Sequence, residues 1–283
     1  MAGTAKGNAR TILITGASSG IGHHLAQALK ARGWQVLASC RKPADCARLE
    51  AEGLASPRID YEDPESIETG FAEALGRTGG RLDALFNNGA YALPGALEDV
   101  PVAGLRQIFE ANFFGWHELT RRAIPVMRAQ GHGRIVMNSS VLGFGYVRIR
   151  GAYTATKHAL EGYTDTLRLE LGGTPIRVIL LEPGPIRTKF RLNARAHYER
   201  WIDRENSAWA DFYRDVVDPR LFGEASKPDP FELGPEATTR KLIHALESRR
   251  PRPRYYVTTP TYIVGMLKRL LPTGLLDRIF MQG

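Results

Sequence analysis

A short apolar stretch that runs into closely spaced glycines constrains the fold of this chain most. Residues 11–15 are suited to a strand, Gly16, Gly20 and Gly22 follow, and an amphipathic helical pattern continues to about residue 33. Glycines allow a tight turn and a close approach of the backbone to a bound group. A strand, a glycine turn and a helix form the unit that places a pyrophosphate at a helix N-terminus. We expect the phosphate contacts to come from Gly16, Ser18, Ser19, Gly20, Ile21 and Gly22.

The chain continues as alternating strands and helices, without internal repeats or a separable second domain. Further strands are expected at residues 34–40, 57–60, 82–86, 135–137, 176–181 and 254–258. One long helix is expected over residues 101–130, and Asp63-Pro64 reads as the start of another. Such alternation predicts an α/β doubly wound parallel sheet (a Rossmann fold) in one domain, with its ligand beyond the C-terminal ends of the strands.

A tyrosine, a lysine and a serine form the candidate catalytic set. Tyr153 and Lys157 are four residues apart in a predicted helix, 151–171, so their side chains share one face. An ammonium near a phenol favours the phenolate and lowers the pKa of the phenol. Ser140 follows the strand at 135–137, where a hydroxyl can reach a nearby helix. The three groups suit hydride transfer to a carbonyl, although separately they could be a solvated pair and a helix cap.

With the glycine turn, this set resembles the short-chain dehydrogenase/reductase family over roughly residues 10–190. The resemblance implies that Ser140, Tyr153 and Lys157 are catalytic, and that Tyr153 and Lys157 also contact the nicotinamide half of the cofactor. It places Asn112 at a fourth catalytic position, where a backbone carbonyl freed by a helix kink would hold a water in a proton relay to Lys157.

The resemblance also implies further cofactor contacts. Asp60 and the backbone of Tyr61 would lie at the adenine, and Asn87 would lie near the cofactor in a tract that reads Asn-Asn-Gly-Ala where the family usually has Asn-Asn-Ala-Gly. The segment after the strand at 176–181 would meet the nicotinamide carboxamide through Pro183, Gly184, Ile186 and Thr188.

The end of the second strand predicts the choice of cofactor. An NAD site needs a carboxylate there for the ribose 2′-hydroxyl, whereas an NADP site needs cations for the 2′-phosphate. Cys40 stands in the place of the acid, and Arg41 follows it. We therefore expect NADP; the alternative is that Arg41 is a surface charge paired with Asp45.

The composition of the chain limits the kinds of binding partner and the cellular location to be expected. The net charge is +8, but the basic residues are scattered, and the densest run, 249–254, lacks a nucleic-acid-binding module. That run is expected to be a solvated loop, with contact to anionic lipid headgroups as the alternative. Two cysteines give no disulfide framework, and no secretory leader, spanning stretch or metal site is apparent. The expected location is cytoplasmic.

Two segments lie outside the regular alternation, besides a frayed tail at residues 1–10. Residues 190–233 are rich in aromatic side chains and are expected to form a substrate lid, or else an added structural subdomain. Residues 260–283 form a basic amphipathic extension. It could pack on its own domain or on a partner subunit, or lie in a membrane interface as a peripheral contact.

The predicted activity is NADPH-dependent reduction of an apolar aldehyde or ketone. The tracts 133–137, 182–188 and 267–272 resemble the bacterial NADP-dependent aldehyde reductases, a branch related to retinol and 17β-hydroxysteroid dehydrogenases. Alternatives are a retinol- or steroid-type alcohol dehydrogenase and an NADP-sensing protein without catalysis. Resemblance also implies a homo-oligomer that pairs through the helices at 101–130 and 151–172.

Overall fold

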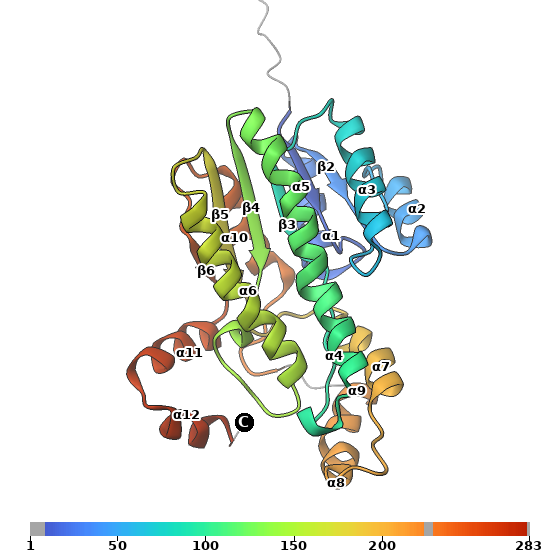
Figure 1. The fold of residues 1–283 in the computed structure, drawn as a ribbon, viewed down its shortest axis with the longest axis vertical. Coiled ribbons are helices and arrows are strands. Elements are labelled where there is room, and N and C mark those ends of the chain that lie inside the picture. Colours follow the sequence, from blue (N-terminus) through green and yellow to red (C-terminus); the bar gives the residue numbers. More distant parts are fainter. Residues whose placement is uncertain (1–8, 224–228, 282–283) are drawn as a thin grey trace, which may run out of the picture.

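A parallel six-stranded sheet in the order β2-β1-β3-β4-β5-β6 organises the molecule (Figure 1). The computed structural model describes residues 9–223 and 229–281, so most of the predicted tail at 1–10 lies outside the described residues. The strands are β1 Thr11–Ile14, β2 Gln35–Ala38, β3 Ala84–Asn87, β4 Gly133–Asn138, β5 Ile176–Glu182 and β6 Arg254–Tyr256. This confirms the predicted doubly wound Rossmann architecture.

Helices cover both faces of the sheet, and each layer buries its own apolar cluster. One cluster takes residues from α1 (Gly20–Ala31), α2 (Pro43–Ala51) and α10 (Pro235–Glu247). The other takes residues from α3 (Pro64–Arg77), α5 (Gly115–Ala129) and α6 (Gly151–Glu170). Because both faces are covered, the strands are almost wholly buried and read as continuous apolar runs.

The predicted strand at 57–60 is wrong. Over residues 57–60 the structure has one isolated bridge, which joins Arg58 to Cys40 just beyond the end of β2. Pro57 has no N–H group to donate to a ladder, which limits pairing at this edge of the sheet. Asp63, just beyond, caps α3 as predicted, because its carboxylate accepts a hydrogen bond from the Ser66 N–H at 3.1 Å.

The long helix predicted at 101–130 is interrupted by a wide turn. It begins as α4 (Val102–Phe109), passes through a π-helical segment at Glu110–Phe114, and continues as α5. At this turn the Gly115 N–H bonds the Glu110 carbonyl, five residues back. Such π-turns often occur at functional sites, and this one carries Asn112.

The aromatic segment folds into helices beneath the carboxyl ends of the strands (Figure 1). These are α7 (Phe190–Trp201), α8 (Ala210–Phe212), a π-helical turn at Tyr213–Val217, and α9 (Asp218–Phe222). Tyr198 and Tyr213 are fully buried in the same apolar cluster as Tyr153. These rings therefore form a third apolar cluster, which packs around Tyr153.

The chain ends in two helices that project from the main body (Figure 1). They are α11 (Thr259–Leu270) and α12 (Thr273–Phe280), and Pro272 lies between them. Within the described ranges, no helix has the length and apolar character needed to cross a membrane.

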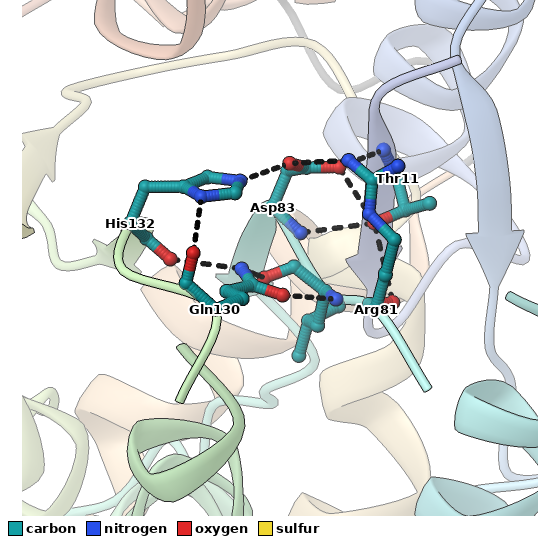
Figure 2. Close-up of polar contacts among 6 residues, drawn as sticks. Thr11, Arg81, Asp83, Gln130 and His132 are labelled. Atoms are coloured by element: carbon teal, nitrogen blue, oxygen red, sulfur yellow. Dashed lines mark hydrogen bonds and ion pairs between the residues drawn. The ribbon is translucent and has the colours of Figure 1, made fainter. Parts of the chain in front are cut away.

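A closed polar network joins the amino ends of three strands (Figure 2). The Asp83 carboxylate accepts bonds from the Thr11 N–H at 2.7 Å and the Thr11 hydroxyl at 2.9 Å. It also lies 2.5 Å from His132 Nε2 and 3.4 Å from the Arg81 guanidinium. Gln130 completes the network by bonding both polar groups of the Leu82 backbone. Burial pushes the Asp83 pKa upward, but these donors outweigh it and hold that pKa below its ordinary value.

Candidate active site

The end of β4 brings the predicted catalytic residues together. Ser140 lies just beyond this strand and caps a single 3₁₀ turn, Val141–Gly143, by accepting the Leu142 N–H at 3.1 Å. The first two turns of α6 carry Tyr153 and Lys157, which are both buried. The capping role and the predicted catalytic role of Ser140 are compatible, because its hydroxyl also acts on the Tyr153 phenol and lowers the pKa of that phenol.

Lys157 is a buried cation held by the strand end. Its side chain is 1% exposed, and Nζ donates to the Asn138 carbonyl at 2.7 Å. Nζ also lies 4.3 Å from the centre of the Trp116 ring, in a cation–π contact. Burial lowers the Lys157 pKa to about 7, although the nearby charge of Glu161 opposes that shift. The amine can therefore gain and lose a proton near neutral pH.

Tyr153 is a phenol that keeps its proton. Burial raises its pKa above the ordinary value, whereas the Ser140 hydrogen bond and the charge of Arg150 act in the opposite direction. The edge of the Phe190 ring contributes to this burial, with ring centres 5.4 Å apart. The expected lowering of this pKa by Lys157 is not seen, because Nζ is directed at Asn138 and lies 5.5 Å from the centre of the Tyr153 ring.

Asn112 joins the π-helical turn to the loop after β3. Its amide donates to the Tyr91 carbonyl at 2.9 Å and to the Thr156 hydroxyl at 3.3 Å, and its oxygen accepts the Tyr91 N–H at 3.1 Å. The amide of Asn112 therefore makes its hydrogen bonds to Tyr91 and Thr156, which hold the π-helical turn in place. The predicted helix irregularity is present, and any relay role would have to use the Asn112 backbone.

The glycine turn forms a cradle that side chains would fill. Gly16 and Gly20 have φ angles of +60° and +58°, which favour glycine. A Cβ on Gly16 would lie 2.5 Å from the Gly89 Cα, and one on Gly22 would lie 2.7 Å from the Gly16 carbonyl oxygen. Ser19 gives α1 no side-chain cap, which leaves its first N–H groups for an anion.

A cavity of about 480 Å³ opens beside this helix N-terminus. Its lining includes Ser19 and Gly20 from the turn and Thr188 from the segment after β5. Arg187 and Lys189 add positive charge to the wall. The shape and charge of this site fit the pyrophosphate of a dinucleotide, so the residues present fit NAD(P).

The loop after β3 packs closely against the glycine turn. Asn88 donates to the Thr15 carbonyl at 2.9 Å, and Asn138 donates to the Asn88 oxygen at 2.8 Å. A Cβ on Gly89 would lie 3.3 Å from the Gly16 nitrogen. The Gly-Ala order of this chain therefore puts glycine at the point of closest approach. Asn87 is buried and donates to the Thr120 hydroxyl at 3.0 Å, so its side chain is structural.

The residues predicted to bind the adenosine half of the cofactor lie near β2, the strand at one edge of the sheet. Arg41 is exposed, and Asp45, its suggested partner, lies 3.7 Å from Arg48 instead. Cys40 is 2% exposed, and burial raises its thiol pKa to about 12, so its side chain belongs to the core. Asp60 accepts the Glu62 N–H at 3.2 Å, and the Tyr61 hydroxyl lies 2.7 Å from both Thr15 Oγ1 and Asn87 Oδ1.

The predicted nicotinamide segment is fixed by its backbone. The Pro183 carbonyl accepts the Val141 N–H at 2.8 Å, which ties this segment to Ser140. A Cβ on Gly184 would lie 2.1 Å from the Thr258 hydroxyl, so glycine is required there. Ile186 pairs with Leu233 in an isolated bridge, and Thr188 accepts the Phe190 N–H at 3.2 Å.

Comparison with known proteins identifies the family. A family model described as short chain dehydrogenase matches residues 10–199. The chain belongs to the short-chain dehydrogenase family. It is 43% identical over 280 residues to YbbO, an uncharacterized oxidoreductase of Escherichia coli K12, with 99% of this chain and 97% of that protein covered. It is thus an oxidoreductase of this family.

Two further relatives support this assignment. The chain is 30% identical over 285 residues to an NADPH-dependent 3-dehydrocapnine reductase of Ornithobacterium rhinotracheale, with 96% of each chain covered. A solved short-chain dehydrogenase from Streptomyces avermitilis superposes with a TM-score of 0.76 at 27% identity, covering 98% of this chain and 95% of that one.

Sequence reasoning missed an ionic cluster behind Lys157. Arg254 on β6 lies 2.5 Å from each of Glu161, Glu182 and Asp165, and Ser139 donates to Glu161. Burial, followed by the charge of Glu161, raises the Glu182 pKa to about 8. The only sequence signal was Glu161 itself, one helical turn beyond Lys157. No sequence pattern indicated that Trp116 and Asn138 would contact Lys157.

The described residues also bear on metal chemistry. Over 9–223 and 229–281, no group of three or more His, Cys, Asp or Glu side chains is placed to hold a metal ion.

Proposed function

We propose that this short-chain dehydrogenase uses NADPH to reduce an apolar aldehyde or ketone to the alcohol. The observation that carries the proposal is the convergence of Ser140, Tyr153 and Lys157 at the end of β4, next to the glycine cradle. The residues that would hold the cofactor are those of the turn, Arg41, and the segment 183–188. The bound nicotinamide supplies a hydride to the carbonyl carbon.

In this proposal Tyr153 is the acid and Ser140 holds the substrate oxygen. The phenol is protonated at neutral pH, as a proton donor must be. Burial raises its pKa and so weakens it as an acid, whereas Ser140 and the charge of Arg150 lower that pKa and favour donation. Ser140 lowers the pKa of the phenol and can orient a carbonyl oxygen beside it. The cluster of buried rings around Tyr153 excludes water and favours an apolar substrate.

Lys157 restores the proton to Tyr153 and would also bind the nicotinamide ribose. Its pKa of about 7 allows it to carry a proton at physiological pH. The Asn138 carbonyl and the Trp116 ring keep the amine in place at the strand end. Asn112 fixes the neighbouring π-helical turn, whose backbone would hold the relay water.

NADPH is favoured over NADH by the end of β2. Arg41 is exposed and makes no ion pair with another described residue, so its guanidinium is available to a 2′-phosphate. The buried Cys40 brings no negative charge to this edge. The name of the 3-dehydrocapnine reductase, an NADPH-dependent relative, agrees with this choice.

The test is a panel of carbonyl compounds with both cofactors. NADPH oxidation would be followed with short- and long-chain aldehydes, aromatic aldehydes, retinal and ketosteroids. We expect steady turnover with an apolar aldehyde and a preference for NADPH. Turnover confined to retinal or to a steroid would instead support the alcohol-dehydrogenase alternative. NADPH binding without turnover on any compound would support a sensor and contradict the proposal.

We further propose that the chain forms a homo-oligomer through α6 and the long helix made of α4, the π-helical turn and α5. Phe113 packs edge-on against Phe114 and Tyr163, which joins the two helices at their surface. Phe114 is itself 49% exposed and would be covered by a partner subunit. Sedimentation velocity over a wide concentration range should show an oligomer, whereas a monomer throughout would contradict this.

A further inference from the structure

The penultimate helix, α11, has a second apolar face that the described residues leave largely exposed, apart from a contact of Tyr262 with Tyr256. Thr261 and Gly265 form the face that is buried. A different face carries four exposed apolar side chains at helical spacing, Tyr262, Ile263, Met266 and Leu270. Leu270 is 70% exposed and Met266 is 55% exposed, so this face is open to solvent. Arg269 borders it on the helix surface.

The last helix, α12, repeats this arrangement. Leu276 is its buried side chain, and Leu275 and Ile279 lie exposed on an adjoining face, one turn apart. Arg278 borders that face. Two consecutive helices thus each combine an exposed apolar stripe with a flanking arginine, the pattern of helices that lie at a membrane surface.

The charge of this segment is one-sided. Its basic residues are Lys268, Arg269 and Arg278, all exposed. Its single acid is Asp277, which lies within 2.7 Å of the Tyr146 hydroxyl and is therefore already engaged. A surface of exposed apolar groups and cations complements anionic headgroups over acyl chains.

The two helices are attached to the loop that leads into the catalytic helix. Tyr146 binds Asp277, and its ring meets the edge of Phe280 with centres 5.0 Å apart. Arg148 donates to the Met281 carbonyl at 3.2 Å. The same loop runs from Ser140 to Tyr153, so a surface that holds α11 and α12 also holds one side of the candidate active site.

A cavity of about 290 Å³ lies on this side of the molecule. The loop lines it with Val147, Arg148 and Ile149, and the lid adds Trp209. Val147 is 40% exposed at this opening, and Glu98 and Arg148 add charged groups to its lining. An apolar compound dissolved in a bilayer would meet this opening first if α11 and α12 lay on that bilayer.

We propose that α11 and α12 bind the surface of an anionic lipid bilayer and hold the loop at 144–149 against it. A second copy of the chain fits this surface less well, because a symmetric pair would bring together two cationic surfaces whose one acid, Asp277, is already engaged by Tyr146. The proposal goes beyond the carbonyl reductase activity and does not depend on it.

The test is co-flotation of the purified full chain with vesicles, either of phosphatidylcholine alone or with about one-third phosphatidylglycerol. We expect flotation with the anionic vesicles that weakens as salt is raised. The variant R269E/R278E should lose affinity by roughly 30-fold or more, because each basic residue near such a surface contributes about 1 kcal/mol. The variant M266S/L270S should also float poorly, since it removes apolar contact.

The matched control is R249E/R250E. It reverses the same number of charges in the basic run at the opposite end of β6, and it should float like the unaltered chain. NADPH oxidation with a water-soluble aldehyde should be unchanged in all three variants, which separates this test from that of the proposed function. Failure to float with anionic vesicles, or equal loss in the control, would overturn the proposal. So would apolar-dependent self-association without vesicles, which would assign the surface to a second copy.

Discussion

The two ends of the parallel sheet carry polar clusters of opposite character. At the amino end, the Asp83 carboxylate meets donors from Thr11, Arg81 and His132, and both of its oxygens are bonded (Figure 2). At the carboxyl end, the buried Asn138 Oδ1, Glu182 Oε2 and Tyr91 hydroxyl have no partner among the described residues. Closed networks of this kind stabilise a fold, whereas open hydrogen-bonding capacity around a buried lysine leaves groups for a ligand.

The largest expected effect is on chemistry at the carboxyl end. Tyr153→Phe removes the acid and should lower the turnover number by roughly 100-fold or more, the range of general acid catalysis. NADPH binding and the unfolding midpoint should change little. Turnover near that of the unaltered enzyme, measured on an active substrate from the panel, would show that Tyr153 is not the acid. The carboxyl end of the sheet would then not be the catalytic end by this measurement.

The converse experiment alters the amino end. Asp83→Asn keeps the shape of the side chain but removes the charge that four donors share, and it should lower the free energy of unfolding by about 2–3 kcal/mol. Chemical denaturation measures this loss. The turnover number of the folded variant should be unchanged. An enzyme of normal stability but low turnover would show that this network serves catalysis instead.

A smaller effect is expected at the cofactor's adenosine end. Arg41→Asp places a carboxylate at an exposed position, where it would repel a 2′-phosphate and could accept a bond from a 2′-hydroxyl. The ratio of kcat/KM for NADPH over NADH should fall roughly 10- to 100-fold, as for the loss of one charged hydrogen bond. The same change at Cys40 would bury a charge, so Arg41 is the better position. An unaltered enzyme that prefers NADH would contradict the cofactor assignment.

The smallest effect concerns stability in acid. The Asp83 pKa is lower in the folded chain than in the unfolded chain, so the unfolded state binds more protons in acid. The contribution of the Asp83 carboxylate to the free energy of unfolding is therefore fully present above the unfolded-state pKa of about 4. It is lost as the pH falls through the lower pKa of the folded state. Unfolding curves between neutral pH and roughly pH 3 should show a shallower loss for Asp83→Asn than for the unaltered chain. If the two proteins lost stability equally as the pH fell, carboxylates other than Asp83 would dominate the acid dependence of stability.

The sequence predicted those features that depend on local patterns. The glycine turn, the order of strands and helices and the placement of Ser140, Tyr153 and Lys157 follow from spacing and periodicity, and the structure contains them. The strand at 57–60 failed because pairing at a sheet edge depends on a neighbour that the local sequence does not reveal. The π-helical turn around Asn112 has no signature in the helical pattern itself, and a kink there was expected only from the family resemblance.

Features that depend on distant residues could not be predicted. Arg254 meets Glu161 and Glu182 across 93 and 72 positions of the chain, so the cluster exists only after folding. The pKa of Tyr153 differed in direction from the expectation because burial in the apolar cluster outweighs the effects of Ser140 and Arg150. The buried position of Cys40 similarly depends on how the edge of the sheet packs.

The central claim is that this enzyme moves a hydride from NADPH to a carbonyl carbon while Tyr153 protonates the oxygen. The most direct measurement is a single turnover with NADPH deuterated at the pro-S position, the side of the ring implied by family resemblance, with the alcohol analysed by mass spectrometry. The account predicts one deuterium in the alcohol formed by the unaltered enzyme and a rate at least about 100-fold lower for Tyr153→Phe. An unlabelled alcohol, or equal rates for the two enzymes, would contradict it.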